Sequence, residues 1–414
     1  METGPAINRI RTALAPTRAW LHAKAPVVLA VLGIGILGLI ATYAERVHEE
    51  RKPEYAQARL EALRAALGPP PPGTMPKVAP PPAFVKGIYV SAAAAGTKNM
   101  FAGLVDLVDR TELNAMVIDV KDGTGELAFI PGDTSLNDHV AAHPELGHLK
   151  DFTAPLRAKG IYLIARIFVF QDPAYVKLHP EVAVKSKATG GIWRDRKGIP
   201  WVDAAHQEGW EYAAKIAREA YQGGFDEVQF DYIRFPTDGN MPDMKFPVYD
   251  AGTTTKAATM GKFFSYLDDE LGGTGVKTSV DLFGLVMWDH DYDLNIGQRL
   301  DVAAPHFDYI SPMVYPSHYP KGFDGYANPA DHPYDVIYKN LVRGQPVTET
   351  LRKANPDARI ATIRPWIQDF NLGAFYSPAM IKAEMKAAVD GGASGWLLWN
   401  ARNRYTEAAL GPQR

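Results

Sequence analysis

Residues 224–236 read GFDEVQFDYIRFP. The run at 227–233 is rich in β-branched and aromatic residues, which favours a strand, and alternate residues of a strand point to the same side. We therefore expect Glu227, Gln229, Asp231 and Ile233 on one face, with Asp231 late in the strand. A charge late in an otherwise buried strand requires either an ion-pair partner or a function.

Seven further runs of this kind alternate with segments of helical periodicity after residue 84. The eight runs are KGIYVS (86–91), AMVIDVK (115–121), IYLIARIF (161–168), EVQFDYI (227–233), KTSVDLF (277–283), DYISPMVY (308–315), RIATIRPW (359–366) and GWLLWNA (395–401). Such alternation is typical of parallel strands joined by crossover helices. The pattern predicts an α/β fold closed into a (β/α)8 TIM barrel. A doubly wound open sheet is the alternative, but no Gly-x-Gly-x-x-Gly turn follows the first run.

Two aspartates occupy equivalent late positions in neighbouring strands of this barrel. Reactive groups of such barrels lie at the C-terminal ends of the strands, so Asp231 and Asp281 should approach each other at the barrel mouth. Glycoside hydrolysis uses a carboxylate pair, in which one member attacks or steadies the sugar and the other protonates the leaving oxygen. The alternative for Asp231 is a structural carboxylate that pairs only with Arg234 or Arg166.

The second run continues as VIDVKDGTGEL, which places three charged residues together at the rim. We expect Asp119 to be a third acidic group or a sugar ligand, and Asp122 to contact the sugar or supply the proton. An internal ion pair of Asp119 with Lys121 or Arg166 is the alternative. Arg166 would lower the pKa of a neighbouring aspartate and help to orient the sugar, or serve only as a counter-ion.

Aromatic residues gather at the ends of the later strands, where a sugar could stack on them. Tyr315, Trp366 and Trp399 are expected to form this surface, with Asn400 as a polar contact beside it. Gln229, on the same strand face as Asp231, is expected to contact the same ligand.

The composition excludes several other functions. The chain of 414 residues is 46% hydrophobic, which suits one large domain, and its net charge of -3 gives no basic field for nucleic acid. There is no cysteine, so disulfides and thiolate zinc sites are excluded. The histidines lack the spacing of a metal motif on one helix, and we expect no metal or other cofactor.

The N-terminal region predicts a membrane anchor. Residues 25–44, APVVLAVLGIGILGLIATYA, carry no charge over the length of a transmembrane helix. A cleaved signal peptide is the alternative. A small excess of Lys and Arg before this segment predicts that residues 1–24 are cytoplasmic and that the barrel is extracytoplasmic.

A connecting region follows at residues 45–82. Its first part, to residue 67, has the pattern of a polar helical stalk. Residues 68–82, GPPPPGTMPKVAPPP, should be extended because prolines lack the amide donors of helices and ladders. The predicted barrel domain comprises residues 83–414.

Several motifs, in their order, resemble the bacterial family of putative glycoside hydrolases with an amylase-like barrel. They are KGIYVS, LVDRTELNAMVIDVKDGTGEL, GGIWRDRKGIPWVD, GFDEVQFDYIRFP, ISPMVYPSHY, RPWIQDF and GWLLWNA. The resemblance implies a TIM barrel and a carbohydrate substrate. In amylase-like relatives an aspartate nucleophile ends strand four, which matches Asp231, but the strand-five glutamate is replaced here by Asp281. Two runs are also similar to chitinase-type barrels, although Ile233 stands where that family has its catalytic glutamate.

Two functional hypotheses follow from these observations. The first is a glycosidase of the bacterial cytoplasmic membrane that cleaves a cell-envelope or extracellular polysaccharide with Asp231, Asp281 and Asp119. The second is a catalytically silent barrel that binds glycan or scaffolds an envelope complex, which the missing strand-five glutamate favours.

Overall fold

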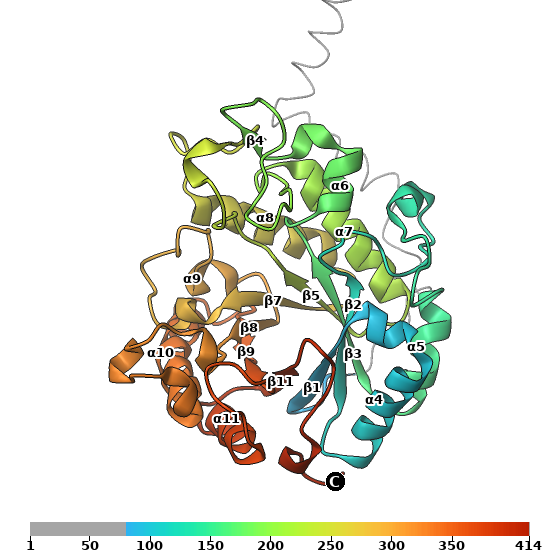
Figure 1. Ribbon diagram of the computed structural model, residues 1–414, viewed down its shortest axis with the longest axis vertical. Helices are drawn as coiled ribbons and strands as arrows, with labels where there is room; N and C mark the ends of the chain where they lie inside the picture. Colours follow the sequence, from blue (N-terminus) through green and yellow to red (C-terminus); the bar gives the residue numbers. More distant parts are fainter. Residues whose placement is uncertain (1–79, 414) are drawn as a thin grey trace, which may run out of the picture. The chain divides into compact units, whose positions relative to one another are not determined.

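The computed structural model describes residues 80–413 (Figure 1). Parallel strands form a closed barrel in the order β10-β11-β1-β2-β3-β5-β7-β8-β9, and a pairing between β10 and β8 completes the ring. The strands are β1 (Val85–Val90), β2 (Ala115–Lys121), β3 (Tyr162–Phe168), β5 (Glu227–Asp231), β7 (Lys277–Phe283), β8 (Tyr309–Met313), β9 (Thr362–Ile363), β10 (Trp366–Gln368) and β11 (Gly395–Trp399). The predicted (β/α)8 barrel is confirmed.

The seventh strand position is split into two short segments. β9 pairs with β8, whereas β10 pairs chiefly with β11. Pro365 lies between the two segments and has no amide hydrogen to donate to a ladder. The strand predicted at residues 359–366 therefore begins later than expected and is interrupted.

An outer layer of helices covers the barrel (Figure 1). The helices are α3 (Ala92–Gly96), α4 (Lys98–Arg110), α5 (Leu149–Ala158), α6 (Pro173–Leu178), α7 (Gln207–Gln222), α8 (Lys256–Leu271), α9 (Leu300–Ala303), α10 (Pro333–Ala354) and α11 (Pro378–Asp390). Their starts follow ordinary capping chemistry: Thr255 accepts a hydrogen bond from the Ala258 amide, and Ser377 accepts one from the Met380 amide.

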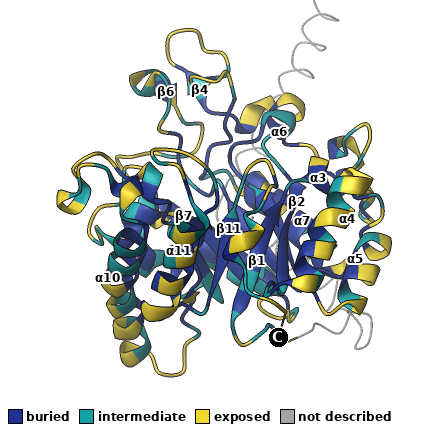
Figure 2. Cartoon of the chain, turned by 60° about the horizontal axis from the view of Figure 1, so that its bottom comes forward, coloured by how far each residue is buried: buried dark blue, intermediate teal, exposed yellow. Residues whose placement is uncertain are grey.

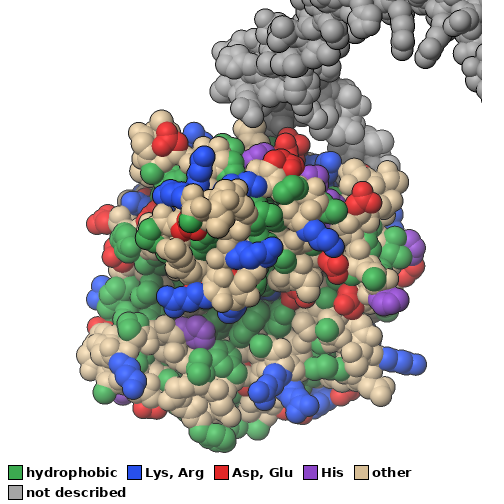
Figure 3. Space-filling model, turned by 45° about the horizontal axis from the view of Figure 1, so that its top comes forward, with side chains coloured by type: hydrophobic (Ala, Val, Ile, Leu, Met, Phe, Trp, Pro, Cys, Tyr) green, Lys and Arg blue, Asp and Glu red, His purple; other side chains and the backbone are tan. Residues whose placement is uncertain are grey.

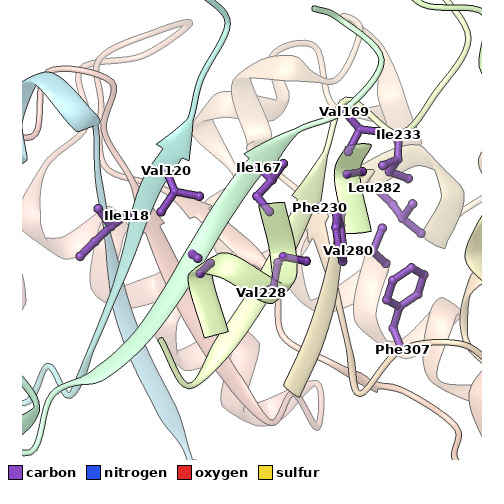
Figure 4. Packing of buried hydrophobic residues seen from close by; sticks show 14 of the residues in the cluster. Ile118, Val120, Ile167, Val169, Val228, Phe230, Ile233, Val280, Leu282 and Phe307 are labelled. Atoms are coloured by element: carbon purple, nitrogen blue, oxygen red, sulfur yellow. The ribbon is translucent and has the colours of Figure 1, made fainter. Parts of the chain in front are cut away.

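Alternation along the strands produces two cores. Outward residues such as Val228, Phe230 and Val280 pack between the barrel and its helices (Figure 4). Inward residues form a smaller cluster inside the barrel, which contains Val85, Tyr89, Ala115, Val117, Tyr162, Ile164, Tyr315, Trp366 and Leu397. Polar residues of β5 share this interior, so the centre of the barrel is not purely apolar.

The end of the barrel where the strands begin, its base, contains a buried ion pair. The Arg364 guanidinium pairs with Glu227, and both side chains are fully buried. Tyr162 also donates its hydroxyl hydrogen to Glu227, at 3.1 Å. The last described residues return to the same end, where the Glu112 amide donates to the Gly411 carbonyl at 2.9 Å.

The loops at the other end of the strands form the mouth, and long loops follow β2, β3 and β5. β4 (Lys185–Ser186) from the first loop pairs antiparallel with β6 (Met244–Lys245) from the second. This small sheet rises above one side of the mouth (Figure 2).

Within residues 80–413, no helix combines the length and apolar character needed to cross a membrane. The membrane helix predicted at residues 25–44, the stalk and the linker up to residue 79 lie outside the described residues, so these assignments stay predictions.

Candidate active site

Arg166 lies at the centre of the mouth and contacts three aspartates. Its Nη1 donates to Asp119 Oδ1 at 2.7 Å, its Nη2 pairs with Asp231, and its Nε lies 3.4 Å from Asp281 Oδ2. Each of the four residues exposes 5% of its surface or less. The structure thus brings together the three carboxylates that the sequence placed at strand ends.

The strand register explains this convergence. Asp119 of β2 lies beside Arg166 of β3, and Asp231 of β5 lies beside Phe168, two residues further along β3. Residues two apart on a strand face the same side, so the cation from β3 lies between acids from the strands around it. Asp281 reaches it from β7.

Asp119 is held by two donors. The Tyr89 hydroxyl donates to Asp119 Oδ2 at 2.5 Å, and Arg166 occupies the other oxygen. Burial raises the pKa of Asp119 to about 6, although Arg166 and the Tyr89 hydrogen bond both act to lower it. The alternative pairing of Asp119 with Lys121 is wrong, because Lys121 pairs with the buried Asp172 at 2.7 Å.

Asp281 is as deeply buried as Asp119, with 1% of its surface exposed. Burial, followed by the negative charge of Asp231, raises the pKa of Asp281 well above its usual range. Trp366 donates its indole hydrogen to Asp281 Oδ1 at 2.7 Å. Trp366 is only 1% exposed, so it supports Asp281 from inside the barrel, whereas the sequence placed it on a sugar-stacking surface.

Asp231 is the most exposed of the three carboxylates, with 8% of its side chain accessible. Its Oδ1 accepts a hydrogen bond from the Tyr232 amide at 2.5 Å. Tyr232 has a φ of 55°, which lies in the left-handed region that non-glycine residues rarely occupy. Residues in such conformations cluster at functional sites. Arg234, which the sequence offered as a partner, makes no ion pair with Asp231.

The strained residue also ends the alternation of β5. Ile233 was predicted on the face of Asp231, but it is fully buried in the outer core, near Val169 and Leu282 (Figure 4). The left-handed turn at Tyr232 redirects the chain and reverses the side to which the next residue points.

Aromatic rings surround the Arg166 guanidinium. Its central carbon lies 4.5 Å from the ring centre of Phe168, 5.1 Å from that of Trp399 and 5.5 Å from that of Tyr89. Trp399 stacks on Tyr89 at 4.0 Å and remains partly exposed, as a sugar platform requires. Tyr315 is 5% exposed and lies mostly within the interior cluster.

The remaining predicted contacts are engaged with the protein itself. Gln229 is fully buried and donates to the Ser311 hydroxyl at 3.1 Å, below the carboxylates. Asp122 accepts hydrogen bonds from the amide and hydroxyl of Thr124. Asn400 donates to two backbone carbonyls of the loops beside it.

Sequence reasoning missed Tyr89, Phe168 and Tyr232. Tyr89 and Phe168 occupy the last inward positions of β1 and β3, so the same alternation that identified Asp231 could have found them. No sequence signal reveals the left-handed conformation of Tyr232, because tyrosine has no preference for it.

The mouth is hollowed on the face shown in Figure 3, where hydrophobic side chains line the depression and Lys and Arg lie around it. A separate cavity of about 280 Å³ lies at the base, against Lys86, Asn114 and Lys159, and does not adjoin the aspartates. Within residues 80–413, one group has the geometry for a metal ion: His179, Glu181 and Glu208. It includes none of the three aspartates.

Comparison with known proteins places this geometry in context. A family model described as a putative glycosyl hydrolase domain matches residues 87–405. A search of curated proteins finds no match.

Three solved structures illustrate the likeness. A hypothetical protein from Ruminiclostridium thermocellum is 32% identical, with 47% of this chain and 96% of that chain covered and a TM-score of 0.42. The PgaB (BpsB) glycoside hydrolase domain from Bordetella bronchiseptica is 13% identical, with 77% and 95% covered and a TM-score of 0.51. An alpha-galactosidase from Thermus thermophilus is 12% identical, with 80% and 60% covered and a TM-score of 0.48. The likeness to the Bordetella domain, at this identity, shows a shared fold.

Proposed function

We propose, from the premise that the chain belongs to the putative glycosyl hydrolase domain family, that it hydrolyses glycosidic bonds at the mouth of its barrel. The observation that carries this proposal is the convergence of Asp119, Asp231 and Asp281 on the single guanidinium of Arg166. Two carboxyl groups that share one guanidinium are less than roughly 10 Å apart, the range in which a carboxylate pair can flank a glycosidic bond.

The environments of the carboxyl groups suggest their roles. Asp231 accepts from both Arg166 and the Tyr232 amide, which suits a carboxylate that attacks or steadies the anomeric carbon. Asp281, whose pKa is raised, suits the acid that gives its proton to the leaving oxygen as the carbon–oxygen bond breaks. Water then supplies the hydroxyl group of the new reducing end. Asp119, with a pKa near 6, is the second candidate for the donor.

The location of the substrate is a further part of the proposal. The uncharged stretch at residues 25–44 supports a membrane anchor, and the small excess of Lys and Arg before it supports a barrel outside the cytoplasm. A barrel in that position would meet cell-envelope or extracellular polysaccharide. The partly exposed ring of Trp399 would stack on its sugars.

A silent glycan-binding barrel is the second candidate, and one observation favours it. Every carboxylate of the cluster already contacts Arg166 and exposes 5% of its surface or less, as in a structural charge network. Such a protein would keep Trp399 as a sugar platform without cleaving the sugar.

Release of reducing ends tests hydrolysis. The full chain, Asp231→Asn and a control, Asp106→Asn, would be incubated with bacterial envelope polysaccharides and exopolysaccharides. Asp106 is an exposed helix residue paired with Arg110, so its replacement should leave activity intact. We expect Asp231→Asn to lose activity by about a hundred-fold or more while its circular dichroism is unchanged. Equal glycan binding by all three proteins, without cleavage of any glycan, would refute hydrolysis and favour the silent barrel.

A further inference from the structure

Arg234 lies three residues beyond Asp231, in the loop that follows β5. The central carbon of its guanidinium lies 4.7 Å from the ring centre of Trp201, 5.4 Å from that of Tyr232 and 5.3 Å from that of Phe283. These rings come from three different segments of the mouth. We call Arg234 with its three rings the arginine cage.

The cation in this cage has no acidic partner in the described part of the chain. Within residues 80–413, no carboxylate lies within ion-pair distance of Arg234. Its Nη1 makes two long hydrogen bonds, to the Phe235 carbonyl at 3.3 Å and the Thr237 hydroxyl at 3.4 Å, and no described residue accepts from its Nε or Nη2. Burial lowers the pKa of Arg234, as expected for a cation that has lost part of its hydration. A partly buried charge without an acidic partner is costly to maintain.

The acids whose charges act on Arg234 are already occupied by other donors, and the first of them, Asp231, pairs with Arg166. Asp195 Oδ1 accepts from the amides of Lys197 and Ile199, and its Oδ2 accepts from the Trp201 indole at 3.1 Å. Asp238 pairs with Arg196 instead. The bonds to Asp195 also fix the Trp201 ring, so the cage is organised without help from a ligand.

The arginine cage adjoins the carboxylate cluster. Tyr232 stacks on Phe168 at 4.3 Å, and Phe168 in turn lies against Arg166. On the other side, Phe283 follows Asp281 by two residues and is 38% exposed. A sugar chain bound over Asp231 would therefore pass close to the free edge of the Arg234 guanidinium.

We propose that Arg234 binds an anionic substituent of the glycan, so that the protein recognises an acidic polysaccharide. A guanidinium presents a planar fork of donors that matches the oxygens of a carboxylate or a phosphate. A uronic acid and a phosphodiester-linked glycan are the two sources of this chemistry. The statement that this glycan is a substrate rests on the proposed function. The statement that Arg234 binds it does not.

Isothermal titration calorimetry with the full chain tests this inference. The probes are polygalacturonate, alginate and hyaluronan as carboxylate glycans, a glycerol-phosphate teichoic acid, and carboxyl-reduced forms of the first three. The variants are Arg234→Gln and Arg234→Lys. The control is Arg343→Gln on α10. Arg343 also lies over a ring, 3.7 Å from the ring centre of Trp288, and makes no ion pair with any residue from 80 to 413. Melting temperatures show whether each variant is folded.

We expect at least one anionic probe to bind. If that probe is a carboxylate glycan, its carboxyl-reduced form should bind much more weakly. Arg234→Gln should weaken that binding by roughly ten- to a hundred-fold, the effect of a charge-assisted hydrogen bond, while Arg343→Gln leaves it unchanged. Arg234→Lys should fall between them, because a point charge replaces the fork. Preference for a uronate over the teichoic acid, or the reverse, identifies the source of the anion.

The inference is overturned if no anionic probe binds, or if Arg234→Gln and the wild type bind it equally. If the wild type and Arg234→Gln cleave a neutral glycan equally well and neither binds an anionic probe, the inference is overturned while the hydrolase proposal stands. Binding of an acidic glycan through Arg234 without cleavage would instead support it and refute hydrolysis of that glycan.

Discussion

Replacing Arg166 by methionine would leave Asp119, Asp231 and Asp281 buried without their shared cation. Removing one partner of a buried ion pair costs about 3–5 kcal/mol of folding free energy. Because three carboxylates contact this guanidinium and none exposes more than 5% of its surface, we expect a loss near the upper end of that range at pH 8.

The loss should depend on pH with a defined sign. In the folded wild type, burial already raises the pKa of Asp119 from 3.8 to about 6 and raises that of Asp281 further. A carboxyl group with a raised folded pKa contributes stability below its unfolded pKa, near 4, and loses it as pH rises through the folded value. Without Arg166 both pKa values rise more. The deficit of Arg166→Met should therefore be small at pH 4–5 and grow towards pH 8.

Urea unfolding at pH 5 and pH 8 measures this effect. The control is Arg218→Met, which removes a partly exposed pair with Glu270 and should cost no more than about 1 kcal/mol at either pH. A variant as stable as the wild type at pH 8, or a deficit independent of pH, would show that the three carboxylates do not depend on Arg166.

Three further predictions follow from the barrel interior. Arg364→Met should lower the free energy of unfolding in urea by about 3–5 kcal/mol, and the double variant that also replaces Glu227 by methionine should recover most of that loss. Equal losses in the single and the double variant would contradict the buried pair. The rate of hydrolysis should decline as pH rises, because Asp281 can donate its proton only while it is protonated. If the Asp281→Asn variant shows the same decline in its pH–rate profile, Asp281 is not the proton donor. Gly395→Ala places a methyl carbon 2.4 Å from the Val85 carbonyl oxygen and should lower the free energy of unfolding by about 1–3 kcal/mol. An unchanged melting temperature would refute this close approach.

The barrel was predictable because its strands are short, apolar and evenly interleaved with helical segments. The meeting of Asp119, Asp231 and Asp281 followed from the same periodicity, since late inward positions of parallel strands share one end of a barrel. The sequence could not give the partner of Lys121, because Asp172 lies in a loop beyond the next strand. Ion pairs of this kind depend on loop paths that hydrophobic patterns do not encode.

Two errors have a common cause in local backbone geometry. The turn at Tyr232 sends Ile233 to the outer core, and Pro365 interrupts the seventh strand, so strict alternation failed at both places.

Trp366 was assigned to a surface because it ends a predicted run. It lies instead at the start of β10, within the barrel, where its indole reaches Asp281.

The described chain enters and leaves the barrel at its base. Residue 85 begins β1 there, and Pro412 pairs with Thr111 at the same end (Figure 2). A mechanical force applied between residues 80 and 413 would therefore act first on β1 and on the short pairing at residues 111–112. The strand ends that carry the aspartates lie away from this line of tension. A handle for surface attachment at residue 413 would accordingly leave the mouth unobstructed.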